Sequence, residues 1–277
     1  MIDCRYDLIK IFNNARFSLR HYAKGYYAVA LGKMTAMPVN RLFMPLANPN
    51  GAYNFIADAG KKYILEPGKL YYIPAFLPTE FCLDEQLLFL SIHNNLEIFP
   101  GVDLFSGCSY MTVIENPPQV QELLALIKTA GENSYINSVR VGSLVFALQT
   151  LLMNYYAEKE FWKPLVLQEF SALMDFLKSH GTARTSVCDL AALRGETREH
   201  FTRHFSHRTG LTPKQLIDRF VMSRCLDLIN SGYSFKETSE SLEFSNEFAF
   251  SRYFKRNMGE SPSHWLRHRR ITKSLSS

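Results

Sequence analysis

The sequence predicts an α+β multidomain chain, with an N-terminal antiparallel β domain, amphipathic helices after it and an all-α C-terminal domain. Three observations support this prediction. Between residues 26 and 93, short β-branched and aromatic runs alternate with Gly, Pro and Asn turns. After Pro117-Pro118, apolar residues recur with the period of a helix. In the C-terminal part, a stretch from Phe201 aligns without gaps on a stretch from Phe250.

The chain has 277 residues, enough for two domains of ~100 to 200 residues each. Its N-terminus, MIDCRYDLIK, lacks the basic start and apolar middle of a secretory signal. The most apolar stretch, SLVFALQTLLMNYY, is shorter than the ~20 residues that a membrane span needs. We therefore expect a cytoplasmic protein that does not bind membranes. Five scattered cysteines without a C-x-x-C pair predict buried thiols rather than disulfides or a zinc site.

The net charge of +5 lies entirely in the C-terminal part of the chain. Residues 1–165 hold 14 Lys and Arg against 14 Asp and Glu, whereas residues 166–277 hold 17 against 12. A basic half joined to a neutral half indicates that one domain contacts a polyanion and that the other has a different task.

The β region contains six runs that read as strands, at the close spacing typical of an antiparallel sandwich or barrel. They are residues 26–31, 41–46, 52–57, 62–68, 69–75 and 87–92. Amphipathic helices are predicted at 119–130 and 137–159, followed by a linker over 158–164 and a helix over 166–180, which starts the basic half.

The repeat preserves a frame of residues rather than one kind of side chain. It conserves two Phe four apart, an Arg and a hydroxyl residue between them, and then Gly and Ser/Thr-Pro. The phenylalanines pack into a core, and the Arg and hydroxyl residues point the other way. The Gly ends the helix with a left-handed turn, and Ser/Thr-Pro caps the next helix.

Three histidines at positions 200, 204 and 207 share one helical face, as the ligands of a zinc site do. In the second copy of the repeat, Ala249, Tyr253 and Arg256 occupy these positions. Because the repeat does not preserve the imidazoles, we interpret the three as solvated or half-packed side chains. No metal and no cofactor is expected.

Each copy of the repeat is preceded by another short helix. A tight turn at Gly195 and a cap at Thr197 lead into the first copy, and a cap at Ser245 leads into the second. Two short helices joined in this way form a helix-turn-helix unit, whose second helix enters the DNA major groove. The segment between the units is helical over about 18 residues, or ~27 Å. Successive major grooves on one face of DNA lie ~34 Å apart, so a rigid helix of this length holds both units over adjacent turns.

Residues 166–270 resemble the DNA-binding domain of the AraC/XylS family of bacterial transcription regulators, through LAALRGETREHFTRHFSHRTGLTP and FKETSESLEFSNEFAFSRYFKRNMGESPSHW. The resemblance implies double-stranded DNA, a second copy of the chain and RNA polymerase as partners. Four residues depart from the family's usual Arg, Ala, Ala and Gly: Val221, Cys225, Ser239 and Glu243. We therefore predict a strained or differently shaped turn at Glu243 and a second unit that docks less firmly than the first.

Residues 26–93 resemble the cupin-like effector domain of such regulators, through GKKYILEPGKLYYIPAFLPTEF. The predicted domains are a cupin-like β-barrel over 1–115, a helical dimerisation or linker segment over 116–160 and the DNA-binding domain over 166–270. The amphipathic pattern of the middle helices also permits another interpretation, in which they only cover the barrel.

In the first unit, Arg198, Glu199, Thr202 and Arg203 lie away from the phenylalanine face and are candidates for DNA contacts. The equivalents in the second unit are Asn246, Glu247, Ser251 and Arg252. Lys255 and Arg256 are expected to meet phosphates. For Phe248 we favour packing inside the protein over contact with a thymine methyl group.

An effector pocket in the β domain needs aromatic walls and a few fixed hydrogen-bonding groups. Its candidate residues are Tyr27, Arg41, Tyr53, Tyr72, Thr79, Phe81 and His93.

The sequence favours a transcription regulator controlled by a small molecule, which the family resemblance suggests is sugar-like. One alternative is a constitutive DNA-binding protein whose β domain only dimerises. A metal-dependent cupin enzyme needs several histidines and a carboxylate, whereas residues 1–165 contain only His21 and His93. We therefore expect no enzymatic activity and no catalytic residues.

Overall fold

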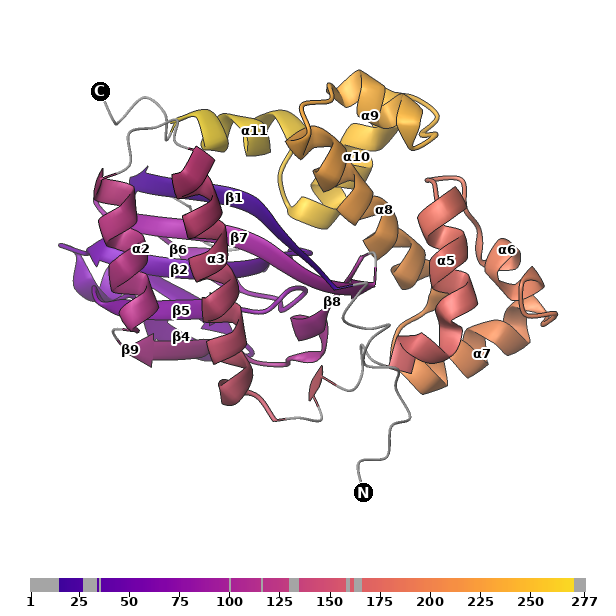
Figure 1. Ribbon diagram of the computed structural model, residues 1–277, viewed down its shortest axis with the longest axis horizontal. Helices are drawn as coiled ribbons and strands as arrows, with labels where there is room; N and C mark the ends of the chain where they lie inside the picture. Colours follow the sequence, from indigo (N-terminus) through magenta and orange to yellow (C-terminus); the bar gives the residue numbers. More distant parts are fainter. Residues whose placement is uncertain are drawn as a thin grey trace. The chain divides into compact units, whose positions relative to one another are not determined.

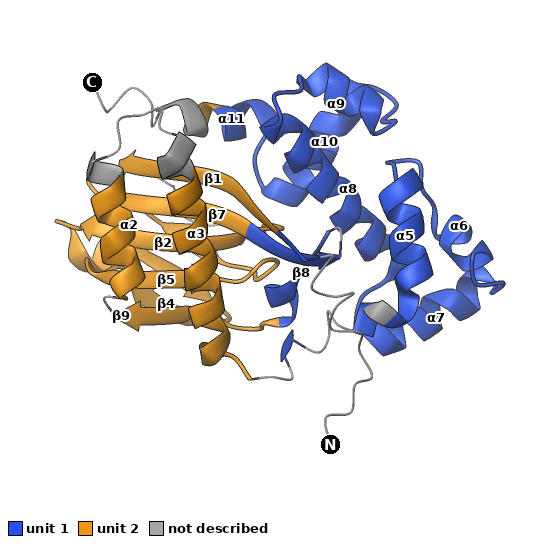
Figure 2. Ribbon diagram, viewed as in Figure 1, with its two compact units in different colours: residues 1–16, 95–107, 158–266 blue, residues 17–94, 108–157, 267–277 orange. Residues whose placement is uncertain are grey.

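The computed structural model describes residues 15–26, 34, 36–99, 101–115, 117–129, 135–157, 160–161 and 166–271 (Figure 1). The chain divides into two compact units (Figure 2). Among the described residues, the β unit holds 17–94, 108–157 and 267–271, and the helical unit holds 15–16, 95–107 and 158–266. The helical unit thus includes residues 95–107, which lie within the predicted β domain.

The larger sheet has strand order β1-β7-β2-β5-β9, with β8 paired to β7. Strand β2 is central, and it pairs in antiparallel register with β5 and β7. The strands are β1 Arg16–Tyr26, β2 Asn40–Ala47, β5 Lys69–Ile73, β7 Leu88–Phe99, β8 Val102–Asp103 and β9 Thr112–Glu115.

The smaller sheet has strand order β4-β3-β6, from Lys61–Ile64, Phe55–Asp58 and Glu80–Cys82. A core that includes Phe43, Ile56 and Ile73 joins the two sheets. The predicted β-rich, antiparallel N-terminal domain is therefore confirmed. In the described residues, however, its strands form two open sheets rather than one closed barrel.

Helices α2 (Pro118–Thr129) and α3 (Tyr135–Leu152) lie across one face of the larger sheet (Figure 1). In α3, the buried Gln149 donates a hydrogen bond to Asn94 and accepts one from Tyr72 at 3.2 Å. Because neighbouring residues of a strand point to opposite faces, Tyr72 faces this helix whereas Ile73 faces the smaller sheet. The larger sheet is thus covered on both faces, as its buried strands require.

The first strand lies earlier than the sequence predicted. Strand β1 begins at Arg16, whereas the predicted run over 26–31 lies mostly outside the described residues. The polar side chains of Arg20 and His21 are buried in β1, at 1% and 8% exposure. A strand that buries polar side chains breaks the alternation of apolar and polar residues by which strands are recognised.

The helical unit confirms the predicted order of helices around a long central one. Its α-helices are α5 Ser171–His180, α6 Val187–Ala192, α7 Arg198–Thr209, α8 Pro213–Asn230, α9 Phe235–Ser241, α10 Glu247–Met258 and α11 Pro262–Ile271. Helix α8 has the predicted 18 residues and begins with Pro213 behind a capping box between Thr212 and Gln215.

The β7–β8 hairpin packs on α8 within the helical unit. The hydroxyl of Ser223 in α8 donates a hydrogen bond of 2.6 Å to the buried carboxylate of Glu97 in β7. Gly101, with a φ of +74°, forms the turn of the hairpin, and a Cβ there would lie 2.5 Å from the backbone nitrogen of Phe220. Only glycine fits so close to the helix.

Within the described part of the chain, no helix is long and apolar enough to cross a membrane. Cys82, Cys108 and Cys225 are buried as predicted, whereas Cys188 in α6 is exposed. Cys4 lies outside the described residues.

Candidate nucleic-acid interface

The helical unit contains two helix-turn-helix units, α6–α7 and α9–α10. Thr197 caps the start of α7 by accepting a hydrogen bond from the backbone of His200, and Gly210 ends it with a φ of +71°. Helix α10 likewise ends at Gly259, with a φ of +81°. The prediction that Ser245 caps α10 was wrong, because Asn246 accepts the bond from the Ala249 backbone at 2.8 Å.

Each of these second helices buries one face and exposes the other. Phe201, Phe205, Phe250 and Phe254 are fully buried, at 0% exposure. The ten residues predicted to contact DNA all lie at least partly exposed: Arg198, Glu199, Arg203, Asn246, Glu247, Arg252, Lys255 and Arg256 are exposed, and Thr202 and Ser251 are half-buried. The repeated frame thus presents arginine and hydroxyl groups on two separate helices.

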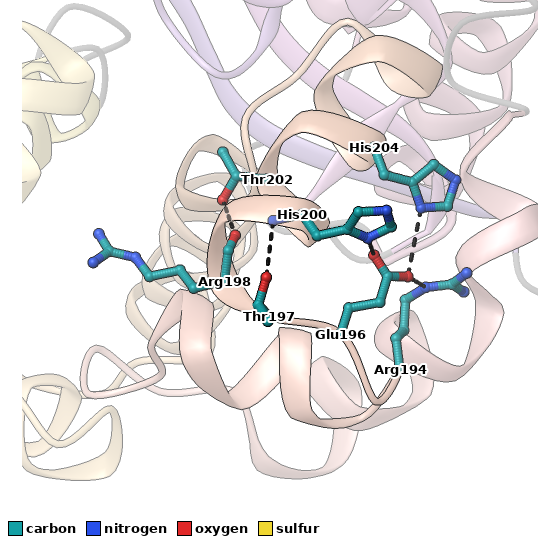
Figure 3. A network of polar contacts seen from close by, with 7 residues as sticks. All are labelled: Arg194, Glu196, Thr197, Arg198, His200, Thr202 and His204. Atoms are coloured by element: carbon teal, nitrogen blue, oxygen red, sulfur yellow. Dashed lines mark hydrogen bonds and ion pairs between the residues drawn. The ribbon is translucent and has the colours of Figure 1, made fainter.

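A polar network around Glu196 accounts for two of the three histidines (Figure 3). The Glu196 carboxylate lies 2.8 Å from Arg194, 2.8 Å from His200 and 3.5 Å from His204. The hydrogen bond from Arg194, supported by the histidines, lowers the pKa of Glu196 to about 2. The two imidazoles contact the turn before α7 through Glu196 and remain 66% and 37% exposed, which agrees with the prediction of solvated or half-packed side chains.

The turn of the second unit has the strain that the sequence predicted at Glu243. This residue has a φ of +55°, in the left-handed region that glycine usually occupies. Its carboxylate accepts a hydrogen bond of 3.0 Å from the Thr182 hydroxyl, and the backbone of Ala183 donates one of 2.9 Å to Leu242. The turn is thereby tied to the loop that precedes the first unit.

A cleft of about 610 Å³ lies beside α10, lined in part by α8 and by the loop before α6. Four cationic side chains line it, together with Asp218 and Glu243. They are Arg184, Lys214, Arg252 and Arg256. The sequence did not single out Arg184, which lies outside the repeat, or Lys214, whose counterpart is Ser263.

Phe248 in α10 was wrongly interpreted as a packing residue. Its side chain is 82% exposed, the most exposed of the large apolar residues in the described chain. It lies on the same helix as Glu247, Ser251 and Arg252, where an apolar group can meet a thymine methyl.

The structure brings four of the seven predicted effector residues together in the β unit. Nη2 of Arg41 donates 2.7 Å to the Thr79 hydroxyl, and its guanidinium lies 5.3 Å from the centre of the Phe81 ring. His93 stands opposite Arg41 in the register of β2 and β7. The other three are apart: Tyr72 faces α3, Tyr53 is 57% exposed in the 3-10 helix Gly51–Tyr53, and Tyr27 lies outside the described residues.

Two further polar residues, which were not predicted from the sequence, lie beside this set. The Ser91 hydroxyl lies 3.4 Å from Nε2 of His93, and the rings of His21 and His93 are 4.9 Å apart. Strand register alone identifies Ser91, because residues two apart on β7 share a face.

Comparison with known proteins gives the class of the protein. The family of helix-turn-helix domains matches residues 190–268. The raffinose operon transcriptional regulatory protein RafR of Pediococcus pentosaceus is 22% identical over 224 residues, covering 78% of this chain and 81% of RafR. The transcriptional regulatory protein HptR of Staphylococcus aureus is 22% identical over 186 residues, covering 67% of this chain and 70% of HptR.

Among solved structures, ToxT of Vibrio cholerae O395 has a TM-score of 0.58 at 13% identity, covering 93% of this chain and 98% of ToxT. A structure of the same protein bound to (E)-4-(8-methylnaphthalen-1-yl)but-3-enoic acid has a TM-score of 0.59, also at 13% identity, covering 91% of this chain and 98% of ToxT. The fold and the two exposed helices define a DNA-binding regulator with two helix-turn-helix units. Its C-terminal part is an AraC-type helix-turn-helix domain, and the chain, which is similar to RafR and HptR, is a transcriptional regulator.

Proposed function

We propose that α7 and α10 read base pairs of an operator, with the ten predicted residues as the contacts. The observation that carries this proposal is the pair of exposed faces that each present an arginine above two buried phenylalanines. In this proposal each helix enters a major groove, where Arg203 and Arg252 bind guanines, while Lys255 and Arg256 contact phosphates. Arg184 and Lys214 add positive charge to the cleft beside α10.

Fragments selected from genomic DNA supply the operator, and fluorescence anisotropy at fixed salt measures affinity for it. Arg203→Ala should weaken operator binding by ~1 to 3 kcal/mol and relax specificity at one base. Lys255→Ala should weaken binding to all sequences alike and reduce the salt slope by about 1. The exposed Arg140 in α3 gives the control Arg140→Ala. Operator affinities equal to wild type for both interface variants would refute the assignment.

A small-molecule effector binds in the β unit and changes how the two reading helices are presented. The gathering of Arg41 and His93 of the larger sheet with Thr79 and Phe81, at β6 of the smaller sheet, supports this part of the proposal. The overall fold is shared with ToxT, structures of which hold (E)-4-(8-methylnaphthalen-1-yl)but-3-enoic acid or an unsaturated fatty acid. RafR carries the name of a raffinose operon, in keeping with a sugar-like effector.

A constitutive DNA-binding protein, whose β unit only dimerises, is the alternative. A ligand at 100 times its Kd stabilises the folded protein by about 2.7 kcal/mol. Thermal melting of the full chain with panels of metabolites therefore separates the two functions. Melting that no metabolite shifts favours the constitutive protein.

The partners are a second copy of the chain and RNA polymerase, and the protein acts in the cytoplasm as a regulator rather than an enzyme. For the second copy, α3 offers Val139 and Phe146, which are 53% and 42% exposed and seven residues apart on one helical face. Val139→Glu with Phe146→Glu should shift sedimentation from dimer to monomer without loss of secondary structure. A monomeric wild type refutes the dimer.

A further inference from the structure

Arg41 is a buried cation that has no counter-charge among the residues that the structure describes. Its side chain belongs to a residue only 3% exposed, at the face of β2 that meets the smaller sheet. Nη2 donates to the Thr79 hydroxyl at 2.7 Å and to the Leu77 carbonyl at 3.4 Å. Nε is buried and meets no acceptor, and no carboxylate of the described residues forms an ion pair with the guanidinium.

Two guanidinium groups of the described chain form ion pairs although they are more exposed than Arg41. Arg16 contacts Asp227 at 2.7 Å, and Arg194 contacts Glu196 at 2.8 Å. A buried charge is more expensive to leave unpaired than an exposed one, yet Arg41 has no carboxylate partner among the described residues. Burial lowers the pKa of Arg41 to about 9, so the guanidinium still carries its charge at neutral pH.

The groups around Arg41 suit an incoming anion. The Thr79 hydroxyl, the imidazole of His93 opposite on β7 and the Ser91 hydroxyl beside it all offer hydrogen bonds and no negative charge. The Phe81 ring covers one side of the guanidinium at 5.3 Å. A planar guanidinium with open N–H donors matches the oxygens of a carboxylate or a phosphate.

We propose that Arg41, Thr79, Phe81, Ser91 and His93, the Arg41 cluster, bind the oxyanion group of a small metabolite, a carboxylate or a phosphate. This inference rests on the proposed effector control and names the chemistry of the effector. A neutral sugar alone leaves the charge of Arg41 uncompensated, whereas an oxyanion supplies both the missing acceptor and the missing counter-charge.

The proposal also predicts how Arg41 affects the stability of the ligand-free protein. A side chain kept for ligand binding lowers stability when the ligand is absent, because its desolvated charge has no partner. Arg41→Met removes the charge and keeps most of the apolar stem. We expect its Tm without ligand to equal or exceed that of wild type. A Tm clearly below wild type would mark Arg41 as a structural residue and overturn the proposal.

The binding test follows the Tm of the full chain against sodium phosphate at constant ionic strength, for wild type, Arg41→Gln and the exposed control Arg140→Gln. Wild type and control should show the same saturable rise, which Arg41→Gln loses. Phosphate also meets the basic helical unit, so an equal rise in all three variants would place the binding there and overturn the proposal. No rise in wild type with phosphate, glucuronate or glucose 6-phosphate would overturn it as well.

Glucose, glucuronate and glucose 6-phosphate, tested in the same way, separate the two oxyanions. If glucuronate raises the Tm in a way that depends on Arg41 and glucose 6-phosphate does not, the site binds a carboxylate. The reverse result indicates that it binds a phosphate. A rise with glucose that survives Arg41→Gln contradicts the proposal. Should Arg41→Gln fail to fold, Arg41→Lys keeps the charge without the planar fork. It should need at least about ten times more phosphate for the same rise.

Operator binding, measured on the same variants, distinguishes this inference from the proposed function. Arg41→Gln should keep the operator affinity of the ligand-free wild type. If it keeps both that affinity and the full phosphate response, the oxyanion site is refuted while the regulator stands. If Arg203→Ala leaves operator affinity unchanged, the DNA interface is refuted while the phosphate titration is unaffected.

Discussion

Substitution by alanine should strongly reduce protein stability at one phenylalanine of α10 and leave it almost unchanged at another. Phe254 is fully buried, and its ring lies 5.9 Å from Phe250 and 5.8 Å from Trp265. Phe248, six residues earlier, is 82% exposed. Phe254→Ala therefore opens a cavity in the core of the second unit, whereas Phe248→Ala removes a side chain that has almost no protein around it.

The expected magnitudes differ by several kcal/mol. Truncation of a buried Phe to Ala costs about 3 to 5 kcal/mol, a large part of the roughly 5 to 15 kcal/mol that stabilises a protein. A surface substitution of this kind changes stability by less than about 0.5 kcal/mol. If Phe248 meets a thymine methyl, its truncation should weaken operator binding by about 1 kcal/mol, or roughly fivefold.

Urea unfolding followed by circular dichroism measures the two stabilities, and anisotropy measures operator binding by the Phe248→Ala protein. An unfolding free energy that drops by more than about 1 kcal/mol in Phe248→Ala would show that this side chain packs inside the protein after all. Equal losses of stability in the two variants would refute the assignment of the inner and outer faces of α10.

Three further predictions concern the helical unit. Gly101→Ala should destabilise the protein by about 2 to 5 kcal/mol in thermal denaturation, because its Cβ would meet the backbone of α8 at 2.5 Å and its φ of +74° disfavours a side chain; a stability within error of wild type would contradict the close approach. Ser223→Ala should cost about 1 to 3 kcal/mol in urea unfolding, since the buried Glu97 carboxylate loses a donor at 2.6 Å; Ser206→Ala, on α7, is the control. The pKa of Glu196 falls from 4.5 to about 2 on folding, so its contribution to the free energy of unfolding is complete above pH 4.5 and disappears as the pH falls towards 2. Over that range the Glu196→Gln protein should therefore lose less stability than wild type. Parallel curves of stability against pH for the two proteins would show that the network does not lower this pKa.

The repeat explains why so much of the helical unit was predictable. A helix that packs two phenylalanines four apart must expose the residues between them, so the faces of α7 and α10 follow from their sequences. The glycine ends of both helices and the Thr212–Pro213 start of α8 follow from local backbone chemistry in the same way. The strain at Glu243 was predictable from the family resemblance, because the family usually has glycine at this position.

The β unit was harder to predict because its contacts connect distant strands. Periodicity placed most of the strands, yet it gave no register, and the register decides which residues share a face. Arg41 meets Thr79 and stands opposite His93 only because β2 pairs with β7 and the smaller sheet closes over the same face. Tyr72, one residue from Ile73, was selected with them but lies on the other face, towards α3.

The amino-acid sequence by itself determined the two helix-turn-helix units, their outward arginines and the order of β and helical parts, because these follow from spacings within short segments. Only the tertiary structure decided that the sheets stay open, that Phe248 is exposed and that residues 95–107 join the helical unit. It also decided that Arg41 is buried and has no carboxylate partner in the described part of the chain. Each of these depends on which distant segments exclude water from a side chain, and local sequence patterns do not encode that.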